Sequence, residues 1–180
     1  MKRPKVLITG ASSGLGKALA CEYQKHGFDL VLIGRDVQRL KALHDELKNG
    51  AEVAIYSADL TTSEGLLCVY SAIETHLPDI VINNAGIGYY GEFSELPLSR
   101  HEEVIKLNIL SLVEVCHIAA KSFIASNKKG IIVNVSSAIA EIQCPLMSIY
   151  AASKAFVTSF SLSLDYELQM KGISVLCSSP

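Results

Sequence analysis

The sequence lacks a metal-binding or disulfide pattern. It contains five cysteines and five histidines, but no C-x-x-C pair and no H-E-x-x-H or similar ligand spacing. The cysteines are odd in number and stand far apart, at Cys21, Cys68, Cys116, Cys144 and Cys177. These absences argue against a zinc knuckle, a disulfide framework or another metal site, and reduced thiols are typical of a cytoplasmic protein.

The sequence also lacks an excess of positive charge. Its 16 lysines and arginines are balanced by 18 aspartates and glutamates, for a formal net charge of -2 at pH 7. Because no broad basic field exists to gather phosphates, nucleic acid is not an expected partner.

Long apolar runs are missing as well. The basic start is followed by only three apolar residues, 6–8, before Thr9 and Gly10, which is too short for a signal peptide. Elsewhere the most apolar stretches are interrupted by polar residues such as Asn134 and Glu141, so none is expected to reach the roughly 20 apolar residues of a membrane span. We therefore expect a soluble, cytoplasmic protein without a membrane partner.

Short apolar, β-branched runs alternate with longer helical patterns. With 180 residues, of which 49% are hydrophobic, one sizeable core can form, so we expect a single domain over residues 1–180. The apolar runs lie at 5–9, 29–34, 52–58, 79–83, 130–137 and 173–177. Such alternation predicts an α/β fold, namely a doubly wound, Rossmann-type parallel sheet in the order 3-2-1-4-5-6 with helices on both faces.

Polar residues mark the starts of two predicted helices. Asp36 is placed to cap a helix, and Ser99 with Glu102 forms a capping box at the head of a segment that runs to about 126. The apolar face of the first of these helices would consist of Val37, Leu40, Leu43 and Leu47.

Two helical segments, 99–126 and 148–171, are apolar over more than one face. One face would pack on the sheet and leave the other exposed in a monomer. We therefore expect a homodimer or homotetramer formed through these segments. The alternative is that chain outside this sequence covers the second face.

A glycine-rich stretch, T-G-A-S-S-G-L-G from Thr9 to Gly16, follows the first strand and leads into a helix. Glycines permit a tight turn and close backbone approach, and a helix N-terminus offers unpaired N–H groups to a pyrophosphate. Structural turns also collect glycine, but the position at the first βα junction favours a dinucleotide. The predicted cofactor-binding residues here are Gly10, Ser12, Ser13, Gly14, Leu15 and Gly16.

The end of the second strand bears on the choice of cofactor. Many NAD-binding sheets place an acidic residue there. Gly34 has no carboxylate to repel a 2'-phosphate and Arg35 supplies a planar cation for it, so we expect NADP(H) to be preferred over NAD(H). Alternatively, Arg35 is a solvated loop residue and Asp36 recognises the ribose. After the third strand, Asp59 and Leu60 would border the adenine, although Asp59 could equally cap the following helix.

Tyr150 and Lys154 are spaced i, i+4 at the start of a helical stretch, which places the phenol and the ammonium on one face. A nearby cation makes a phenol a better proton carrier at neutral pH. Alone, a Y-x-x-x-K pattern is common and is usually an exposed helical pair. Here it is accompanied by Asn84 after the fourth strand and Ser136-Ser137 after the fifth, at the edge where open α/β sheets bind ligands.

Together these motifs resemble those of the short-chain dehydrogenase/reductase family, in its single-domain branch. The resemblance covers residues 5–180 and rests on the T-G-x-x-x-G-x-G stretch, the N-N-A-G stretch 83–86, Asn108, Ser137, Tyr150 and Lys154. It selects Ser137 over Ser136, because the family's serine lies 13 positions before the tyrosine.

The resemblance implies roles for these residues. Tyr150 would be the acid/base, and Lys154 would activate it and hold the nicotinamide ribose. Ser137 would bond the substrate oxygen, and Asn108 would organise a water-linked proton path. Further residues implied to border the cofactor are Asn84, Ala85 and Gly86.

Members of that family continue past a strand like 173–177 into a P-G motif, a substrate-covering lid and one further strand, whereas this sequence ends at Pro180. We expect residues 1–180 to be the dinucleotide-binding domain without that lid and strand. Segments 88–91 and 142–147 would border the substrate, and their aromatic, aliphatic and thiol groups favour an apolar ketone, acyl or steroid-like compound. Alternatively, Tyr89 and Tyr90 pack on the surface and Cys144 is a small buried hydrophobic residue.

The resemblance implies hydride transfer between NADP(H) and a carbonyl or secondary alcohol carbon of a small molecule. A catalytically silent NADP(H)-binding or scaffold protein is the alternative, because fold does not dictate chemistry. Nucleotide-sugar epimerases and dehydratases share the Y-x-x-x-K pair. They usually show a different glycine spacing and a large second domain, for which this sequence has no room.

Overall fold

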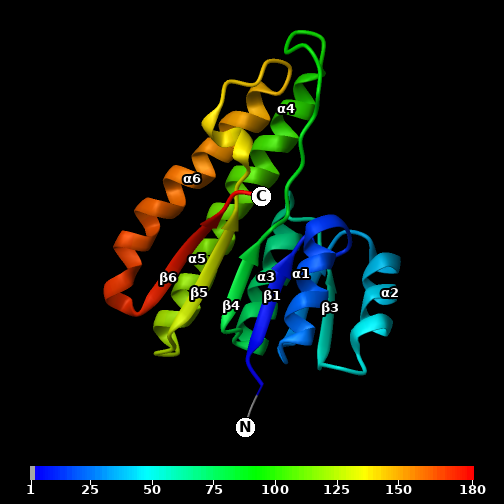
Figure 1. The fold of residues 1–180 in the computed structure, drawn as a ribbon, viewed down its shortest axis with the longest axis vertical. Coiled ribbons are helices and arrows are strands. Elements are labelled where there is room, and N and C mark those ends of the chain that lie inside the picture. The colour runs from blue at the N-terminus through cyan, green and yellow to red at the C-terminus, as the bar shows by residue number, and fades with distance from the viewer. Residues whose placement is uncertain (1–2) are drawn as a thin grey trace.

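The computed structural model describes residues 3–180, so that Met1 and Lys2 of the basic start lie outside the described residues. Its centre is a six-stranded, fully parallel sheet in the order β3-β2-β1-β4-β5-β6 (Figure 1). The strands are β1 (Lys5–Thr9), β2 (Asp29–Gly34), β3 (Val53–Ser57), β4 (Ile80–Asn83), β5 (Gly130–Val135) and β6 (Ile173–Ser178). The predicted fold class and strand order are confirmed.

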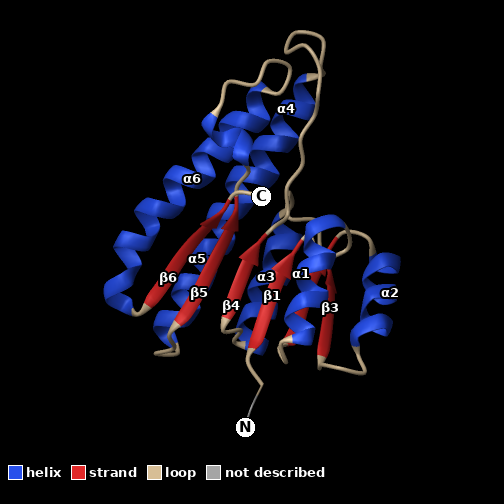
Figure 2. Cartoon of the chain, in the orientation of Figure 1, coloured by secondary structure: helices blue, strands red, loops and turns tan. Residues whose placement is uncertain are grey.

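Helices connect the strands as crossovers. They are α1 (Gly14–Lys25), α2 (Val37–Leu47), α3 (Ser63–His76), α4 (Leu98–Ile105), α5 (Ser111–Ala125) and α6 (Ser148–Leu168). A π-helical turn, Lys106–Leu110, joins α4 to α5, and short 3-10 turns follow β5 and α6. Figure 2 shows the strands pointing their carboxyl ends toward the same edge, from which the longest loops project.

Buried apolar side chains lie on both faces of the sheet. Leu7 is in register with Val31 and Val81, and this row packs against helices α3, α5 and α6. On the opposite face, Ile8 and Leu32 pack against residues of α1 and α2. Since helices cover both faces, the carboxyl edge is the place where this sheet can receive a ligand.

Helix α2 begins as predicted. The Asp36 carboxylate accepts hydrogen bonds from the backbone N–H groups of Gln38 and Arg39, both at 3.0 Å. Leu40, Leu43 and Leu47 of the predicted apolar face are buried, whereas Val37 is exposed.

The predicted capping box at Ser99 is wrong. Helix α4 begins at Leu98, directly after Pro97, and no side chain caps it. Ser99 therefore lies within the first turn. Proline favours a helix start because its φ is already fixed near the helical value and it has no N–H group to leave unpaired.

Contrary to the expectation from the sequence, one helical run, Leu98–Ala125, is long and apolar enough to cross a membrane by length and composition. Half of its most apolar window is buried inside the protein. Val115, Ala119 and Phe123 belong to the core that α5 forms with the sheet. Packing in this core accounts for part of the apolar composition.

Candidate active site at the carboxyl edge of the sheet

The loops after β1, β2, β3 and β4 surround a cavity of about 580 Å³. It opens where the strand order reverses, between β1 and β4, which is the usual ligand position in doubly wound sheets. The predicted cofactor residues that line it are Gly10, Ser12, Ser13, Gly14, Leu15, Arg35, Leu60, Asn84, Ala85 and Gly86. Those that lie outside its lining are Gly16, Asp59, Tyr150 and Lys154.

The glycine loop has the form that a pyrophosphate requires. Ser13 is the N-cap residue of α1, but its side chain makes no capping bond, so the first N–H groups of the helix keep their bonding capacity. A β-carbon on Gly16 would collide with the carbonyl oxygen of Gly10. This glycine lets the helix pack closely on the loop.

Thr9 connects the loops that follow β1 and β4, a role that was not predicted from the sequence. Its Oγ1 accepts hydrogen bonds from the backbone N–H groups of Asn84 and Ala85, both at 3.1 Å. The Asn84 amide donates in return to the Thr9 carbonyl at 2.9 Å. The threonine that opens the T-G stretch was a sufficient signal for this role.

Arg35 lies at the rim of the cavity, with its side chain 55% exposed. The neighbouring Asp36 also lines the cavity, but its carboxylate is engaged by the cap of α2 and by Arg39, at 3.2 Å from Nε. Arg35 has only two longer ionic contacts, 3.9 Å from Asp59 and 3.7 Å from Glu103, so of these two residues it is the one that can turn to a ligand in the cavity.

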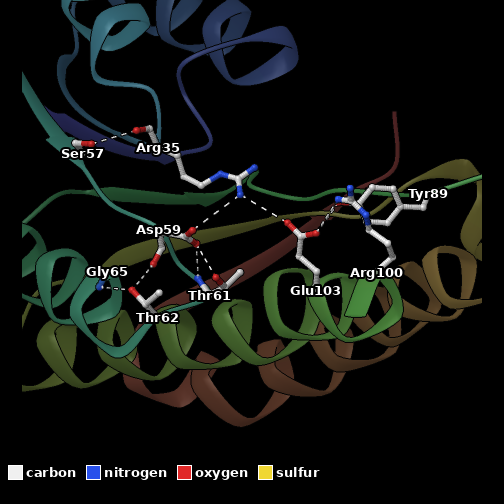
Figure 3. A network of polar contacts seen from close by, with 9 residues as sticks. All are labelled: Arg35, Ser57, Asp59, Thr61, Thr62, Gly65, Tyr89, Arg100 and Glu103. Carbon is white, nitrogen blue, oxygen red and sulfur yellow. Dashed lines mark hydrogen bonds and ion pairs between the residues drawn. The ribbon is translucent and has the colours of Figure 1, made fainter. Parts of the chain in front are cut away.

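Asp59 does not cap α3, because Thr62 does, accepting from the Gly65 N–H at 3.1 Å. Asp59 Oδ1 instead accepts from the backbone N–H and hydroxyl of Thr61, at 2.9 and 2.7 Å (Figure 3). Burial raises the pKa of the Asp59 carboxyl, but the Thr61 bonds and the nearby Arg35 charge outweigh it, so the pKa lies below its usual value. The carboxylate stays ionised at neutral pH.

Tyr150 and Lys154 lie on the first turns of α6. Lys154 is only 5% exposed, and its Nζ donates to the carbonyl of Val135, the last residue of β5, at 2.8 Å. The same Nζ lies 5.8 Å from the centre of the Tyr150 ring. Burial lowers the pKa of the Lys154 ammonium.

The absence of a side chain at Gly88 leaves room for the Tyr150 ring. A β-carbon on Gly88 would lie 2.8 Å from the Tyr150 ring, closer than atoms can pack. A side chain at this position would therefore displace the tyrosine.

The two serines after β5 have different surroundings. Ser136 is buried, and its hydroxyl donates to the Lys154 carbonyl at 2.8 Å and bonds Thr158. The hydroxyl of Ser137 has only a 3.5 Å contact with the Ile139 N–H and is partly exposed. The bonding capacity of Ser137 is thus free for a ligand.

Asn108 lies in the π-helical turn and is almost fully buried. Its side chain accepts from the Ile87 N–H and donates to the Ile87 carbonyl, both at 2.9 Å, and it donates to the Ser153 hydroxyl at 3.0 Å. Ser153 in turn donates to the Tyr150 carbonyl at 2.7 Å. A π-helical turn is often found at a functional site, because it redirects a side chain.

Gly86 lies between the cavity and the buried side chains of Asn108 and Lys154. It lines the cavity, and a β-carbon on it would lie 3.3 Å from the Asn108 amide oxygen and 3.4 Å from Lys154 Nζ. The structure therefore places Asn108 and Lys154 next to Gly86, beside the cavity lining but not part of it.

Sequence comparison agrees with this geometry. A family model described as short chain dehydrogenase matches residues 4–180. The chain belongs to the short-chain dehydrogenase family. Mouse 17-beta-hydroxysteroid dehydrogenase type 3 is 35% identical over 97% of the chain, and rat very-long-chain 3-oxoacyl-CoA reductase is 33% identical over 94%. The chain spans 58% and 56% of the length of these two relatives.

Solved structures of other short-chain dehydrogenases have the same fold. The bulky-bulky ketone specific alcohol dehydrogenase from Comamonas testosteroni is 33% identical with a TM-score of 0.92, covering 98% of this chain and 72% of that one. A short-chain dehydrogenase from Sphingobium yanoikuyae in complex with NADPH is 39% identical with a TM-score of 0.91, covering 97% and 69%.

Within residues 3–180, the chain has no group of three or more histidine, cysteine, aspartate or glutamate side chains placed to hold a metal ion. One residue near the cavity has no counterpart in the predicted site. Glu103 of α4 lies 3.7 Å from Arg35 and accepts a hydrogen bond from Tyr89 (Figure 3). No sequence motif marks it.

Proposed function

We propose that this protein is an NADP(H)-dependent oxidoreductase that transfers a hydride between the nicotinamide and a carbonyl or secondary alcohol carbon. The observation that carries the proposal is the placement of Lys154. It is a buried cation next to Gly86 of the cavity lining, bonded to the Val135 carbonyl and 5.8 Å from the centre of the Tyr150 ring. A desolvated ammonium beside a phenol favours proton transfer at that phenol.

The residues of the cavity fit a dinucleotide. The uncapped N-terminus of α1 offers N–H groups to the pyrophosphate, and the close packing at Gly16 brings them to the cavity. When bound, the nicotinamide supplies or accepts the hydride. Asn84, Ala85 and Gly86 border the same space and would hold the nicotinamide half.

Each candidate catalytic residue has a separate task in this proposal. The Tyr150 hydroxyl gives a proton to the substrate oxygen during reduction and takes it back during oxidation. The Ser137 hydroxyl, which has only a weak internal bond, donates to that same oxygen. Lys154 supplies the cation beside the phenol. Asn108 fixes the Ile87 loop and, through Ser153, the first turn of α6.

Preference for NADP(H) rests on Arg35. Its guanidinium lines the rim of the cavity, whereas the Asp36 carboxylate is engaged by the α2 cap and by Arg39. A planar cation suits the 2'-phosphate of the adenosine ribose. The NADPH complex of the Sphingobium relative supports the same choice.

We propose an apolar ketone, or the corresponding secondary alcohol, as the substrate. Tyr90 is 72% exposed and Ile142 63% exposed in the segments beside Tyr150, which leaves apolar surface for such a molecule. The printed names of the relatives point the same way, because they denote a hydroxysteroid dehydrogenase, an oxoacyl-CoA reductase and a bulky-ketone alcohol dehydrogenase.

A carbonyl screen tests the proposal directly. NADPH oxidation would be followed by its absorbance with steroid, aryl and long-chain ketones, for the wild-type protein and for Tyr150→Phe. We expect turnover with at least one apolar ketone, and its loss in the variant. Binding of NADPH without turnover of any ketone or alcohol would favour the catalytically silent alternative.

A further inference from the structure

The two oxygens of Glu103 face different partners. Oε2 accepts from the Tyr89 hydroxyl at 2.6 Å and lies 3.4 Å from Arg100 Nη1. Oε1 lies 3.7 Å from Arg35 Nη1 (Figure 3). Glu103 is thus held by one oxygen and presents the other to the arginine at the rim of the cavity.

The partners that hold Glu103 are themselves fixed. Arg100 donates to the Tyr89 hydroxyl at 2.7 Å, and its guanidinium lies 4.6 Å from the centre of the Tyr89 ring. These contacts do not involve Arg35. The carboxylate of Glu103 therefore keeps its place whether or not Arg35 moves to a ligand.

Asp59 approaches the same arginine from the end of β3. Its Oδ1 is bonded by Thr61, and its Oδ2 lies 3.9 Å from Arg35 Nη1. Both carboxylates are thus anchored through one oxygen and offer the other to a single guanidinium. At these distances neither contact is a hydrogen bond, so a ligand that hydrogen-bonds to Arg35 can replace them.

The charges around Arg35 do not favour a phosphate. The Arg35 guanidinium is flanked by two carboxylates, and Arg39 is paired with Asp36. A further cation, Arg100, lies 3.4 Å from Glu103 Oε2 and therefore offsets part of the Glu103 charge from the side away from Arg35. A phosphate monoester carries a charge of roughly -1.5 to -2 at neutral pH. It must attract Arg35 against both carboxylates and is itself repelled by them.

We propose that Glu103 is a specificity-determining residue. Its charge competes with the 2'-phosphate of the cofactor for Arg35 and so narrows the preference for NADP(H) over NAD(H). The inference rests on the proposed use of NADP(H), since it concerns the adenosine end of the same cavity. Glu103 acts through Arg35 and contacts no reacting atom.

The substitution Glu103→Gln separates charge from structure. The glutamine side-chain oxygen can still accept from Tyr89 and Arg100, but the charge facing Arg35 is removed. We expect the Kd of NADPH to fall on the order of threefold, as for other partly exposed ion pairs, while the Kd of NADH stays unchanged. The difference in NADPH affinity between Glu103→Gln and wild type should decrease as salt is added, because these charges are accessible to ions.

Glu102→Gln is the matched control. Glu102 is the adjacent residue of α4, is exposed, and undergoes the same change of charge. Glu102→Gln should leave the affinities for NADPH and NADH at their wild-type values. An equal gain in Glu102→Gln, or an equal change for NADH and NADPH, would show a general charge effect and overturn the inference.

Arg35→Gln completes the test. In the Arg35→Gln variant, the additional substitution Glu103→Gln should no longer lower the Kd of NADPH. If the Kd still fell, Glu103 would not act through Arg35. Weaker NADPH binding in Glu103→Gln alone would mean that Glu103 orients Arg35 for the phosphate, which is the opposite role. Failure of the wild-type protein to bind either dinucleotide would overturn the proposed function itself, whereas wild-type binding without an effect at Glu103 overturns only this inference.

Discussion

Asn108 holds the Ile87 residue at both of its backbone polar groups. Its amide oxygen accepts from the Ile87 N–H and its amide nitrogen donates to the Ile87 carbonyl, each at 2.9 Å. Because Ile87 follows the N-N-A-G stretch and precedes Gly88, this clamp sets the path of the chain between the cavity and the Tyr150 ring. The π-helical turn gives Asn108 its reach.

Asn108→Asp tests the clamp. The carboxylate can still accept from the Ile87 N–H but cannot donate to the Ile87 carbonyl or to Ser153, so the buried carbonyl loses its partner and a charge is buried. We expect a loss of about 1–3 kcal/mol in the free energy of unfolding, measured by urea denaturation, and a lower kcat. Asn49→Asp, in an exposed turn, is the control and should change neither quantity.

Tyr150→Phe and Lys154→Met should differ in their effects. Loss of a positioned acid/base lowers turnover by a factor of about 10² to 10⁴, so Tyr150→Phe should lose activity and keep its NADPH affinity. Lys154→Met should weaken both, because the lysine is proposed to hold the cofactor ribose as well. Ser137→Ala should fall between wild type and Tyr150→Phe in turnover. Steady-state rates and NADPH fluorescence measure these effects, and wild-type turnover in Tyr150→Phe would contradict the mechanism.

Arg35→Asp should reverse the cofactor preference. A 2'-phosphate would lose its cation and meet a third carboxylate beside Asp59 and Glu103, so we expect the Kd of NADPH to rise on the order of tenfold or more, and that of NADH to change little. Titration of both cofactors measures this. Lys41→Asp makes the same change of charge on the exposed face of α2 and serves as the control. An equal rise in the Kd values of NADPH and NADH would show that Arg35 does not recognise the 2'-phosphate.

Cys116 should be the least reactive thiol. Burial raises its pKa from 9.0 to about 12, against the smaller opposing effect of its bonds with Asn134 and Asn83. The native thiol stays neutral where the unfolded one ionises, so its contribution to stability is complete below about pH 9 and is lost between pH 9 and 12. Iodoacetamide at pH 8.5, with peptide mapping, should label the partly exposed Cys144 and spare Cys116 until urea is added. Equal labelling rates in the native protein would contradict this.

Self-association, predicted from the sequence, can be tested on α6. Leu162 and Tyr166 of α6 and Met170 of the following 3-10 turn are spaced four residues apart and are all exposed, Met170 the most at 89%. We expect a dimer or tetramer by light scattering, and Leu162→Asp should shift the mass toward that of a monomer. Leu67→Asp introduces the same charge at an exposed leucine of α3 and should not. A monomeric wild-type protein at micromolar concentration would contradict the prediction.

The sequence by itself was enough for the fold, because the pattern that decides it is local. Apolar runs recur at short range, and β1 and β2 have the predicted bounds 5–9 and 29–34. The predicted run 130–137 continues beyond β5, which ends at Val135. Beyond Val135, the Ser136 N–H still donates to the Ser178 carbonyl at 2.7 Å, and its hydroxyl bonds the backbone of α6.

The sequence also placed the glycine loop at the sheet edge, because a turn between a strand and a helix is encoded in adjacent residues. It could not decide between the two roles considered for Asp59. The structure excludes the helix cap, because Thr62 occupies that position and Thr61 bonds the carboxylate.

Only the tertiary structure brought Lys154 to the Val135 carbonyl, Asn108 to both polar groups of Ile87, and Glu103 to Arg35. The first two contacts join residues 19 and 21 positions apart within one strand–helix crossover, and the third joins two side chains from different crossovers. No periodicity or spacing along the chain records such a contact, because its distance depends on how helices α4 and α6 pack above the sheet.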